Sequence, residues 1–322
     1  MYSYTEVKDL VEKGLALWSV PASPPRLYEP IRYLLAIGGK RFRPCLSLLT
    51  ANLFTERIEA CIPPALAMEV FHNFTLMHDD IIDHAPVRRG QQTVHEKWDI
   101  NTAILSGDVM LVKAYVLLCS LETNKLIPAL AIFNKTAIEV CEGQQSDVDF
   151  EKRNDVTIDE YLHMITLKTG VLLGCSAYIG ALAGGGTEED AQHLYTFGKH
   201  LGISFQLQDD LLDAFGDADM FGKKTGGDIT QNKKTFLWIT LQQKLNETDR
   251  VLFGALHNEK DERQKVRQII DLYKKYDIQQ ETENLMLQYY DSAISALQKT
   301  KVTENKISVL MHVAEAIYQR KF

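Results

Sequence analysis

The sequence contains little that would build a β-sheet, a disulfide framework or a membrane anchor. Alternating runs of β-branched residues are rare and no Asn-Gly pair marks a tight hairpin, so strands are not expected to contribute much. The five cysteines are scattered without CxxC spacing, which argues against disulfides or a zinc site and favours a reducing cytoplasm. No secretory signal is expected at the N-terminus. The uncharged stretch 169–187 is rich in glycine, so a buried helix is expected there instead of a membrane span.

The chain also lacks a basic excess and an internal boundary. Lysine and arginine number 35 against 43 aspartates and glutamates, a net charge of −8, which argues against nucleic acid as a partner. No proline-, glycine- or serine-rich linker divides the 322 residues, and no repeat is found apart from one duplicated acidic run. A single domain over residues 1–322 is therefore expected.

What the sequence does contain is helical periodicity along nearly its whole length. This pattern predicts an all-α fold, a bundle of long helices around a central cavity. Asn101 and Thr157 stand where they would cap two of the helices. The expected helices lie at about residues 4–18, 25–37, 44–54, 63–83, 101–121, 126–149, 157–169, 171–182 and 187–216, followed after residue 233 by four or five shorter, charged helices.

Two aspartate-rich runs lie in otherwise apolar helical sequence. Residues four apart share one face of a helix, so each run would stack two carboxylates with a third beside them. Clustered anions are costly to bury without a cation among them. A single run is as well explained by a solvated surface cluster, but two of them predict the two walls of one metal site. Oxygen ligands without histidine or cysteine at ligand spacing suit Mg²⁺. The two runs are Asp79, Asp80 and Asp83, and Asp209, Asp210 and Asp213.

Basic residues gather at predicted helix ends and in loops. The run Gly38–Pro44 places three cations beside two glycines, but it has no preceding strand and no Walker spacing, so it is not a P-loop. Arginine forks match phosphate oxygens, whereas lysine acts as a point charge. Each cation alone is more often a solvated loop charge; their association with the acidic runs predicts that they bind anions. The cations are Lys40, Arg41, Arg43, Arg88, Arg89, Lys168, Lys223, Lys224, Lys233 and Lys234.

In combination these motifs resemble the trans-isoprenyl diphosphate synthase (polyprenyl synthetase) family, and within it the short-chain geranylgeranyl and farnesyl diphosphate synthases. The resemblance covers most of the chain in order, and it implies an isoprenoid-synthase-type helical bundle. Gln91-Gln92 departs from the Lys-Pro that often follows Arg-Arg-Gly. The matching segments are Gly39–Pro44, Glu69–His72, Asp79–Asp83 with Arg88–Gly90, Gly107-Asp108, Gly143–Gln145, Lys168-Thr169 and Phe205–Asp210.

The resemblance implies roles for the matched residues. The expected metal ligands, for about three Mg²⁺ ions per active site, are Asp79, Asp83 and Asp209, supported by Asp80, Asp210 and Asp213. The expected ligands of the allylic diphosphate are Arg88, Lys168, Lys223 and Lys233. The expected ligands of isopentenyl diphosphate are Lys40, Arg43, His72 and Arg89. The residues expected to face the reacting carbons are Thr169 and Gln206. Outside this context, His72 would be an ordinary core histidine.

The implied activity is transfer of an allylic group (dimethylallyl, geranyl or farnesyl) from its diphosphate to isopentenyl diphosphate. Metals and cations would stabilise the departing pyrophosphate, and an apolar cavity would keep water from the carbocation. The alternatives are a class I terpene cyclase, a longer-chain synthase and a catalytically silent subunit. The second acidic run and the Gly38–Pro44 run argue against the cyclase, and the intact Arg88 argues against the silent subunit. The resemblance also implies a homodimer, while the cysteine pattern favours the cytoplasm and the uncharged stretch 169–187 is not expected to be an integral membrane segment.

The helix before the first acidic run is expected to limit the length of the product. Phe74 and Phe71 precede Asp79 by five and eight residues, about 7.5 and 12 Å along a helix. A growing prenyl tail would meet these rings, as in short-chain members, while Thr75 is smaller than the second aromatic of animal-type farnesyl synthases. We therefore expect farnesyl to geranylgeranyl products and favour geranylgeranyl; ordinary core packing is the alternative for both rings. Residues 319–322 match a basic substrate-closing tail only loosely and equally suit the C-terminal end of a helix.

Overall fold

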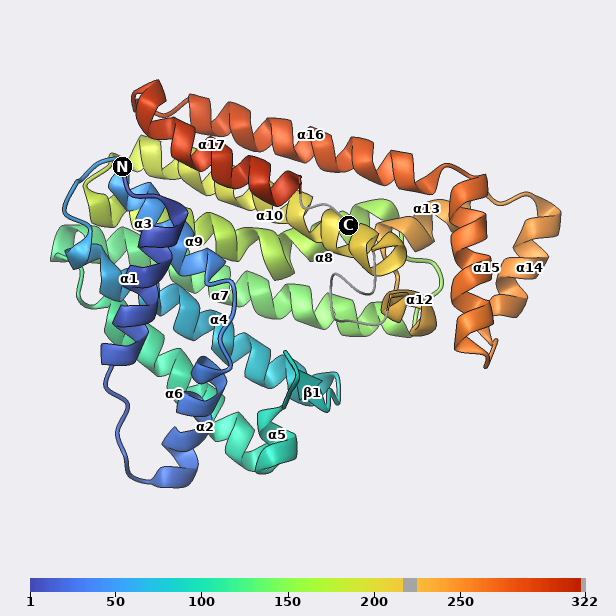
Figure 1. The fold of residues 1–322 in the computed structure, drawn as a ribbon, viewed down its shortest axis with the longest axis horizontal. Helices are drawn as coiled ribbons and strands as arrows, with labels where there is room; N and C mark the ends of the chain where they lie inside the picture. The colour runs from blue at the N-terminus through green and yellow to red at the C-terminus, as the bar shows by residue number, and fades with distance from the viewer. Residues whose placement is uncertain (217–224, 320–322) are drawn as a thin grey trace. The chain divides into compact units, whose positions relative to one another are not determined.

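The structure is a computed structural model that describes residues 1–216 and 225–319. Helices make up most of these residues, as predicted (Figure 1). The strands described are those of one short antiparallel hairpin, β1 (Val87–Arg88) and β2 (Gln91–Gln92). The helices are α1 (Tyr4–Leu17), α2 (Pro25–Ala36), α3 (Phe42–Asn52), η1 (Glu59–Cys61), α4 (Ile62–Ile82), α5 (Val94–Lys97), α6 (Ile100–Leu118), α7 (Thr123–Glu151), α8 (Ile158–Ile165), η2 (Thr166–Gly170), α9 (Val171–Gly184), α10 (Glu188–Phe215), α12 (Gly227–Thr230), α13 (Phe236–Lys244), α14 (Glu247–His257), α15 (Glu262–Lys275), α16 (Ile278–Gln298) and α17 (Glu304–Tyr318).

The chain divides into two compact units. Unit 1 contains Met1–Phe133, Cys175–Tyr195 and Thr300–Leu310, and the remaining residues form unit 2. Helices α7, α9, α10 and α17 contribute residues to both units. A single domain over residues 1–322 stays a prediction.

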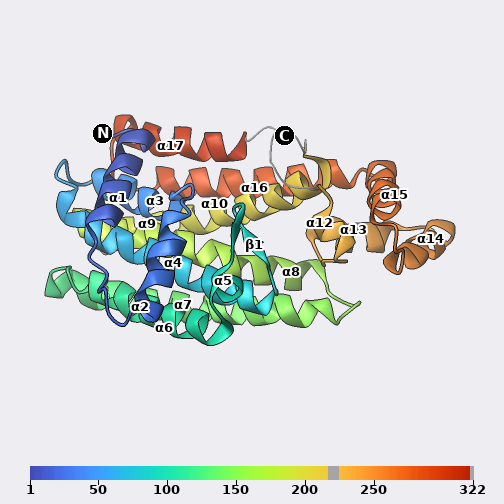
Figure 2. The same ribbon diagram turned by 60° about the horizontal axis from the view of Figure 1, so that its bottom comes forward.

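In unit 1, helix α4 packs along α6 and also contacts α1, α2 and α3. Pro63 and Pro64 lie in its first turn, where a missing N–H removes no helical hydrogen bond. The following segment up to Phe71 is buried on every side, which places the amino-terminal half of α4 in the core. Its carboxyl-terminal half carries the first acidic run. Figure 2 shows the β1–β2 hairpin beside α5, just after this end of α4 in the chain.

Two described helical stretches are long and apolar enough to cross a membrane by length and composition. In the first, Ile158–Gly184, 89% of an apolar 18-residue window is buried inside the protein, so it is the core helix that the glycine-rich sequence predicted. In unit 1 a Cβ on Gly180 or Gly184 would collide with backbone carbonyl oxygens of α3, and glycine therefore permits this close packing. The second stretch is α6, in which 28% of the apolar window is buried and Ile104, Leu105, Val112 and Val116 are among the exposed side chains.

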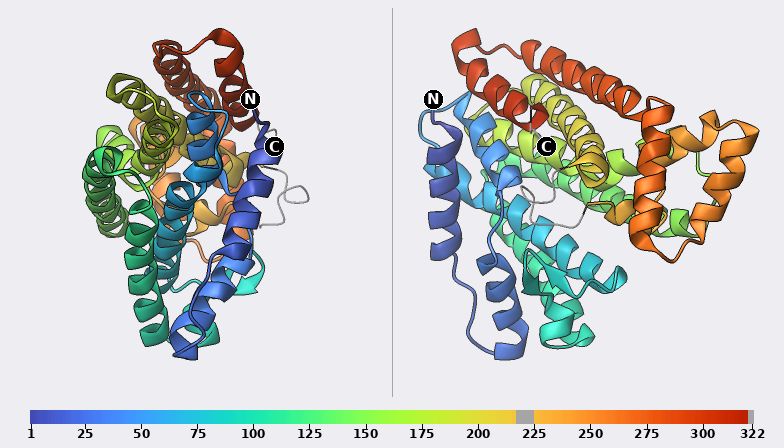
Figure 3. Two further views of the ribbon diagram at one scale, coloured as in Figure 1. Left: turned by 90° about the vertical axis from the view of Figure 1, so that its left-hand side faces the viewer. Right: turned by 45° about the vertical axis from the view of Figure 1, so that its right-hand side comes forward.

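In unit 2, α10 and α16 run side by side (Figure 1), and the Ser204 hydroxyl donates to the Met286 carbonyl over 3.1 Å. Residues of α8, α10, α13, α15 and α16 share one apolar core around Leu207, Leu211 and Trp238. Helix α8 starts with the expected capping box, in which Thr157 bonds Glu160. Helices α14 and α15 pack against each other, as Figure 3 shows in its right panel.

The sequence-based expectations were wrong in four details. The hairpin was not predicted, because its turn uses Arg89-Gly90 in place of Asn-Gly; both residues have positive φ, which a tight two-residue turn requires. Helix α6 begins at Ile100 and is capped by Asp99, not by Asn101. Helix α16 has 21 residues and is not short. The π-helical turn η2 interrupts a pattern that had predicted only α-helix.

Candidate active site

The first acidic run forms the carboxyl-terminal end of α4 in unit 1. The Asp83 amide donates to the Asp79 carbonyl over 2.8 Å, so the last turn stays helical and the two side chains have the expected spacing of one turn. Asp80 differs from both, because it is only 2% exposed. Its carboxylate receives the guanidinium of Arg88, with Nε 2.9 and 3.0 Å from the two oxygens and Nη2 at 2.7 Å. Arg88 therefore neutralises the most buried carboxylate of this run.

The hairpin separates the two arginines of the Arg88-Arg89-Gly90 segment. Arg88 lies in β1 and reaches Asp80, whereas Arg89 lies in the turn and donates to the carbonyl of Gly38. The Arg89 guanidinium covers Gly39, where a Cβ would come within 2.6 Å of Nη1. Because Gly39 has no side chain, the Arg89 guanidinium packs directly against the backbone of this segment. Arg89 and the Gly38–Pro44 run, predicted to bind the same substrate, are in contact.

His72 and Arg43 form the second predicted contact in unit 1, with Arg43 Nη1 3.0 Å from His72 Nε2. Because a guanidinium only donates, Nε2 must accept, and the imidazole is neutral with its proton on Nδ1. Burial, the largest cause, and the neighbouring Arg43 and Arg89 hold the pKa of His72 well below its usual value. Lys40 is exposed. Three of the four predicted isopentenyl diphosphate ligands, Arg43, His72 and Arg89, are thus held by protein contacts in unit 1.

Arg41, in the middle of the same run, is a structural residue. It is 3% exposed and has a left-handed backbone with φ 53°. Its guanidinium donates to Glu69 at 2.7 Å, to Glu12 at 3.0 Å and to the Leu35 carbonyl at 2.6 Å. Sequence reasoning gave neither glutamate a role. The buried network fixes the turn from which Lys40 and Arg43 project.

The second acidic run lies on α10 in unit 2, close to its end. Asp210 is 4% exposed and accepts hydrogen bonds from the Tyr161 hydroxyl and from Gln206 Nε2. Asp213 accepts the backbone amide of Asp228 over 2.9 Å. Burial and the Asp228 charge raise the pKa of Asp210 to about 7 and that of Asp213 to about 6.

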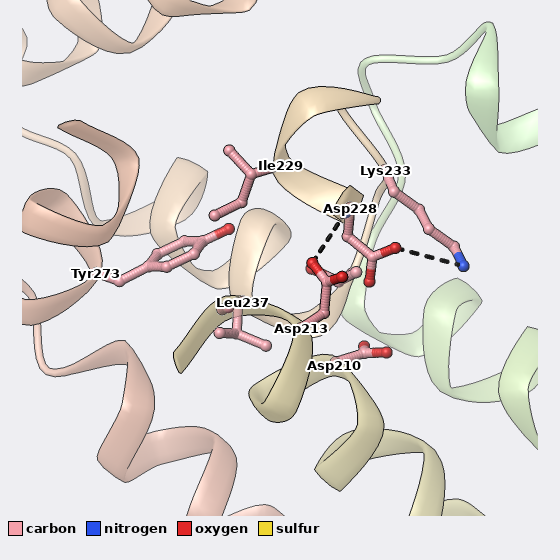
Figure 4. A pocket seen from close by; sticks show the side chains of 9 residues that line it. Asp210, Asp213, Asp228, Ile229, Lys233, Leu237 and Tyr273 are labelled. Atoms are coloured by element: carbon pink, nitrogen blue, oxygen red, sulfur yellow. Dashed lines mark hydrogen bonds and ion pairs between the residues drawn. The ribbon is translucent and has the colours of Figure 1, made fainter. Parts of the chain in front are cut away.

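These carboxylates line one small pocket of unit 2 (Figure 4). Asp228 bonds Asp213 through its backbone amide and directs its carboxylate toward Lys233, whose Nζ lies 3.9 Å away. Asp228 was not predicted; its place in Gly226-Gly227-Asp228, just after the paired lysines, is the only signal that the sequence offered. Lys223 and the end of the chain from residue 320 lie outside the described residues.

The π-helical turn η2 carries Lys168 and Thr169. Lys168 Nζ lies 2.5 Å from the Asp147 carboxylate on α7, a partner that sequence reasoning missed. The Thr169 hydroxyl donates to Gln206 Oε1 over 3.1 Å, so the two residues predicted to face the reacting carbons are in contact. A π-turn widens the helix locally and is common at functional sites. On α7, Gly143 lets the Lys168 backbone approach, because a Cβ there would lie 2.5 Å from its nitrogen.

The residues predicted to measure product length belong to an aromatic cluster in unit 1. Phe71 is buried and its ring lies 5.5 Å from Phe74 and 5.1 Å from Phe133. Tyr115 of α6 meets Phe133 at 5.0 Å, and Phe74 meets His78 at 4.8 Å. Thr75 is half-buried and bonds the His72 carbonyl. We call Phe71, Phe74, His78, Tyr115 and Phe133 the aromatic cluster.

The acidic groups suit Mg²⁺ in their chemistry. Within the part of the chain that the structure describes, no three acidic, histidine or cysteine side chains form a ready-made metal cage. Mg²⁺ needs none, because it is usually held by one or two carboxylates, waters and the phosphates of a substrate. Burial first, and then the charge of Asp228, raise the pKa values of Asp210 and Asp213, and a bound cation would favour their ionised forms. That the two acidic runs face each other stays a prediction.

An all-α fold that carries two aspartate-rich runs, each with basic partners, is the arrangement of an isoprenoid synthase. Comparison with known proteins gives the family. The polyprenyl synthetase profile matches residues 24–273, so this chain belongs to the polyprenyl synthetase family and is a prenyltransferase. The resemblance seen in the motifs is confirmed.

Curated relatives and solved structures of prenyl diphosphate synthases are similar to this chain over most of its length. The chain is 35% identical over 301 residues to geranylgeranyl diphosphate synthase of Methanosarcina mazei, covering 93% of this chain and 91% of that protein. It is 39% identical over 252 residues to geranylfarnesyl diphosphate synthase of Natronomonas pharaonis, covering 73% and 74%. The crystal structure of geranylgeranyl pyrophosphate synthetase from Pyrococcus horikoshii superimposes with a TM-score of 0.91 at 34% identity, covering 99% and 98%.

Proposed function

We propose that the protein condenses isopentenyl diphosphate with an allylic diphosphate to form geranylgeranyl diphosphate. The observation that carries this proposal is that α4 contributes to two separate groups of charged and polar side chains, each of which would hold one diphosphate. His72 with Arg43 and Arg89 forms one, and the Asp79–Asp83 run with Arg88 forms the other. They are separated by at least seven residues, about 10 Å of helix. A terpene cyclase has one diphosphate to bind, and the family match does not support that alternative.

In this proposal the second acidic run and the first bind the allylic diphosphate through Mg²⁺, which would neutralise the phosphates and stabilise the leaving pyrophosphate. Arg88, Lys168 and Lys233 would contact the phosphate oxygens. Each of these three cations lies beside a carboxylate in the structure, so its position is set before substrate arrives.

Gln206 would orient the reacting carbons. Its Nε2 donates to Asp210 and its Oε1 accepts from Thr169, so both ends of the amide are fixed. The remaining lone pairs of Gln206 Oε1 and Thr169 Oγ1 would offer partial negative charge to the allylic carbocation. No histidine base is required, because the departing pyrophosphate can accept the proton that the condensed carbocation loses as its new double bond forms.

The length of the product depends on where the growing prenyl tail is stopped. Relatives named for geranylgeranyl and for geranylfarnesyl products match this chain at 35% and 39% identity, so overall similarity does not separate the two lengths. The aromatic cluster supports the shorter product, since Phe74 and Phe71 would stop a tail about 7.5 and 12 Å along α4 from Asp79. Geranylfarnesyl diphosphate is the second candidate.

We also propose a homodimer in which α6 packs against a second copy of the chain. Leu105, Val112 and Val116 are 57%, 61% and 58% exposed in unit 1. Their spacing of seven and four residues places them on one face of α6. Monomers seldom expose such a continuous apolar stripe.

The proposed location is the cytoplasm. The five cysteines form no disulfide, which supports a reducing compartment.

The test is to incubate the purified protein with Mg²⁺, isopentenyl diphosphate and each of the dimethylallyl, geranyl and farnesyl primers, and to separate the products by chromatography. Geranylgeranyl diphosphate is expected from all three. His72→Ala should raise the KM for isopentenyl diphosphate about 10-fold or more and leave the KM for the primer nearly unchanged. Arg57→Ala, at an exposed arginine outside both groups, is the control. Absence of elongation with every primer would contradict the proposal.

A further inference from the structure

His78 directly precedes the first acidic run, and its ring lies between α4 and α6. Its Nε2 is 3.1 Å from the Ile104 carbonyl oxygen of α6. Because a carbonyl only accepts, Nε2 carries the proton that forms this bond. The ring occupies the space beside Gly107, where a Cβ would come within 2.6 Å of Cδ2. Glycine at position 107 is therefore the reason that a histidine fits at this crossing of α4 and α6.

The same ring contacts Phe74, which lies one helical turn earlier on α4. The two centroids are 4.8 Å apart and the planes meet at 69°, an edge-to-face contact. Phe74 is only half-buried, and its other ring neighbour is Phe71 at 5.5 Å. Phe71 in turn is held by Phe133. Phe74 thus has a ring of the aromatic cluster on either side and yet keeps an exposed part.

We propose that His78 is a positioning residue for product length: anchored to α6, it holds the Phe74 ring in the orientation that stops the growing prenyl tail. Phe74 is unbranched at Cβ and changes rotamer readily unless neighbours prevent it. The His78–Ile104 bond fixes one neighbour to α6, and the packing of Phe71 fixes the other. Removing the His78 ring leaves room on one side of Phe74. The inference rests on the proposed function, since it assigns the residue that sets where elongation ends.

An edge-to-face pair contributes about 0.5–1.5 kcal/mol, which corresponds to about a 2- to 12-fold change in the population of the held rotamer. His78→Ala should therefore raise the molar ratio of the next longer product to the parent product by about 2- to 12-fold. His78→Asn, which keeps a donor for the Ile104 carbonyl but no ring, should lengthen the product as well. Neither variant changes a charge expected to touch substrate.

The experiment measures the product ratio of the full-length protein with Mg²⁺, isopentenyl diphosphate and farnesyl diphosphate, for wild type, His78→Ala, His78→Asn, Phe74→Ala and the His78→Ala/Phe74→Ala double variant. If His78 acts through Phe74, the double variant gives the same ratio as Phe74→Ala alone. His95→Ala, a histidine outside the aromatic cluster, is the control and should keep the wild-type ratio.

Failure of the proposed function and failure of the inference about His78 give different results in this experiment. If wild type forms no prenyl diphosphate, the proposed function fails and this inference with it. If wild type is active but both His78 variants keep its product ratio, only the inference is overturned. A lower total rate at an unchanged ratio would indicate a purely structural role and also overturn it. An additive double variant would show that His78 does not act through Phe74. Should His78→Ala fail to fold, His78→Asn decides.

Discussion

Asp210 is expected to destabilise the protein at neutral and alkaline pH when no divalent cation is bound. The carboxyl is 4% exposed and lies with Asp213 and Asp228 along one small pocket. Burial, followed by the Asp228 charge, raises its pKa from an ordinary 3.8 to about 7, although Tyr161 donates a hydrogen bond to it. Replacing Asp210 with asparagine keeps an oxygen acceptor for Tyr161 and removes the ionisation.

The direction in which pH changes the stability follows from the raised pKa of Asp210. The folded state binds the Asp210 proton more tightly than the unfolded chain, so stability is complete below about pH 4 and is lost as pH rises through about 7. A difference of about 3 pH units corresponds to about 4 kcal/mol at most. Between pH 5 and pH 8 the part that changes is about 2–3 kcal/mol. Asp210→Asn should therefore stabilise the protein by about that much more at pH 8 than at pH 5.

The measurement is urea denaturation in the presence of a chelator at both pH values. The exposed Asp271 provides a matched Asp→Asn control, which should change stability little at either pH. Adding Mg²⁺ with inorganic pyrophosphate should stabilise wild type and reduce the advantage of the variant. A gain that is the same at pH 5 and pH 8, or a variant less stable than wild type at pH 8, would refute this account of Asp210.

Three further changes test other parts of the structure. Arg41→Met leaves Glu69 buried without its ion-pair partner and should cost about 3–5 kcal/mol in urea denaturation; a loss below about 1 kcal/mol would show that the network does not matter. Tyr161→Phe removes a donor from buried Asp210 and should destabilise the protein by about 1.5–3 kcal/mol at pH 8 and less at pH 5; equal losses at both pH values would argue against a bond to the ionised carboxyl. Val112→Glu introduces a charge into the exposed stripe of α6 and should produce a monomer in sedimentation; an unchanged oligomer would move the interface elsewhere.

Sequence patterns predicted the helices and the spacing within the acidic runs because both depend on residues close together in the chain. The capping box at Thr157 and the one-turn spacing of Asp79 and Asp83 are of this kind. Helix α16 is longer than the shorter helices expected after residue 233, and its 21 residues contain no glycine or proline that would end it earlier. The π-turn at Lys168 was not predictable from periodicity, since α9, which follows it, is buried on nearly every side and has no single apolar face that would reveal a shift in phase.

The partners of the predicted site residues were mostly missed, for a different physical reason. Asp147 is 21 residues from Lys168, and Tyr161 is 49 residues from Asp210. Contacts at such separations depend on tertiary packing, and single tyrosines or aspartates on helices have no local pattern that reveals them. Glu69 belongs to a matched motif, but only the buried position of Arg41 shows what it does.

These partners change the expected chemistry of the site. Among the described residues, three of the cations predicted to hold the allylic diphosphate lie beside a carboxylate within their own unit: Arg88 with Asp80, Lys168 with Asp147, and Lys233 with Asp228. An incoming anion alone would compete with those carboxylates and leave them unpaired, which is unfavourable where they are buried. Mg²⁺ and diphosphate together offer a partner to both members of each pair. We therefore expect diphosphate and Mg²⁺ each to bind weakly alone and to bind cooperatively together, and calorimetric titration of pyrophosphate with and without Mg²⁺ would measure that coupling.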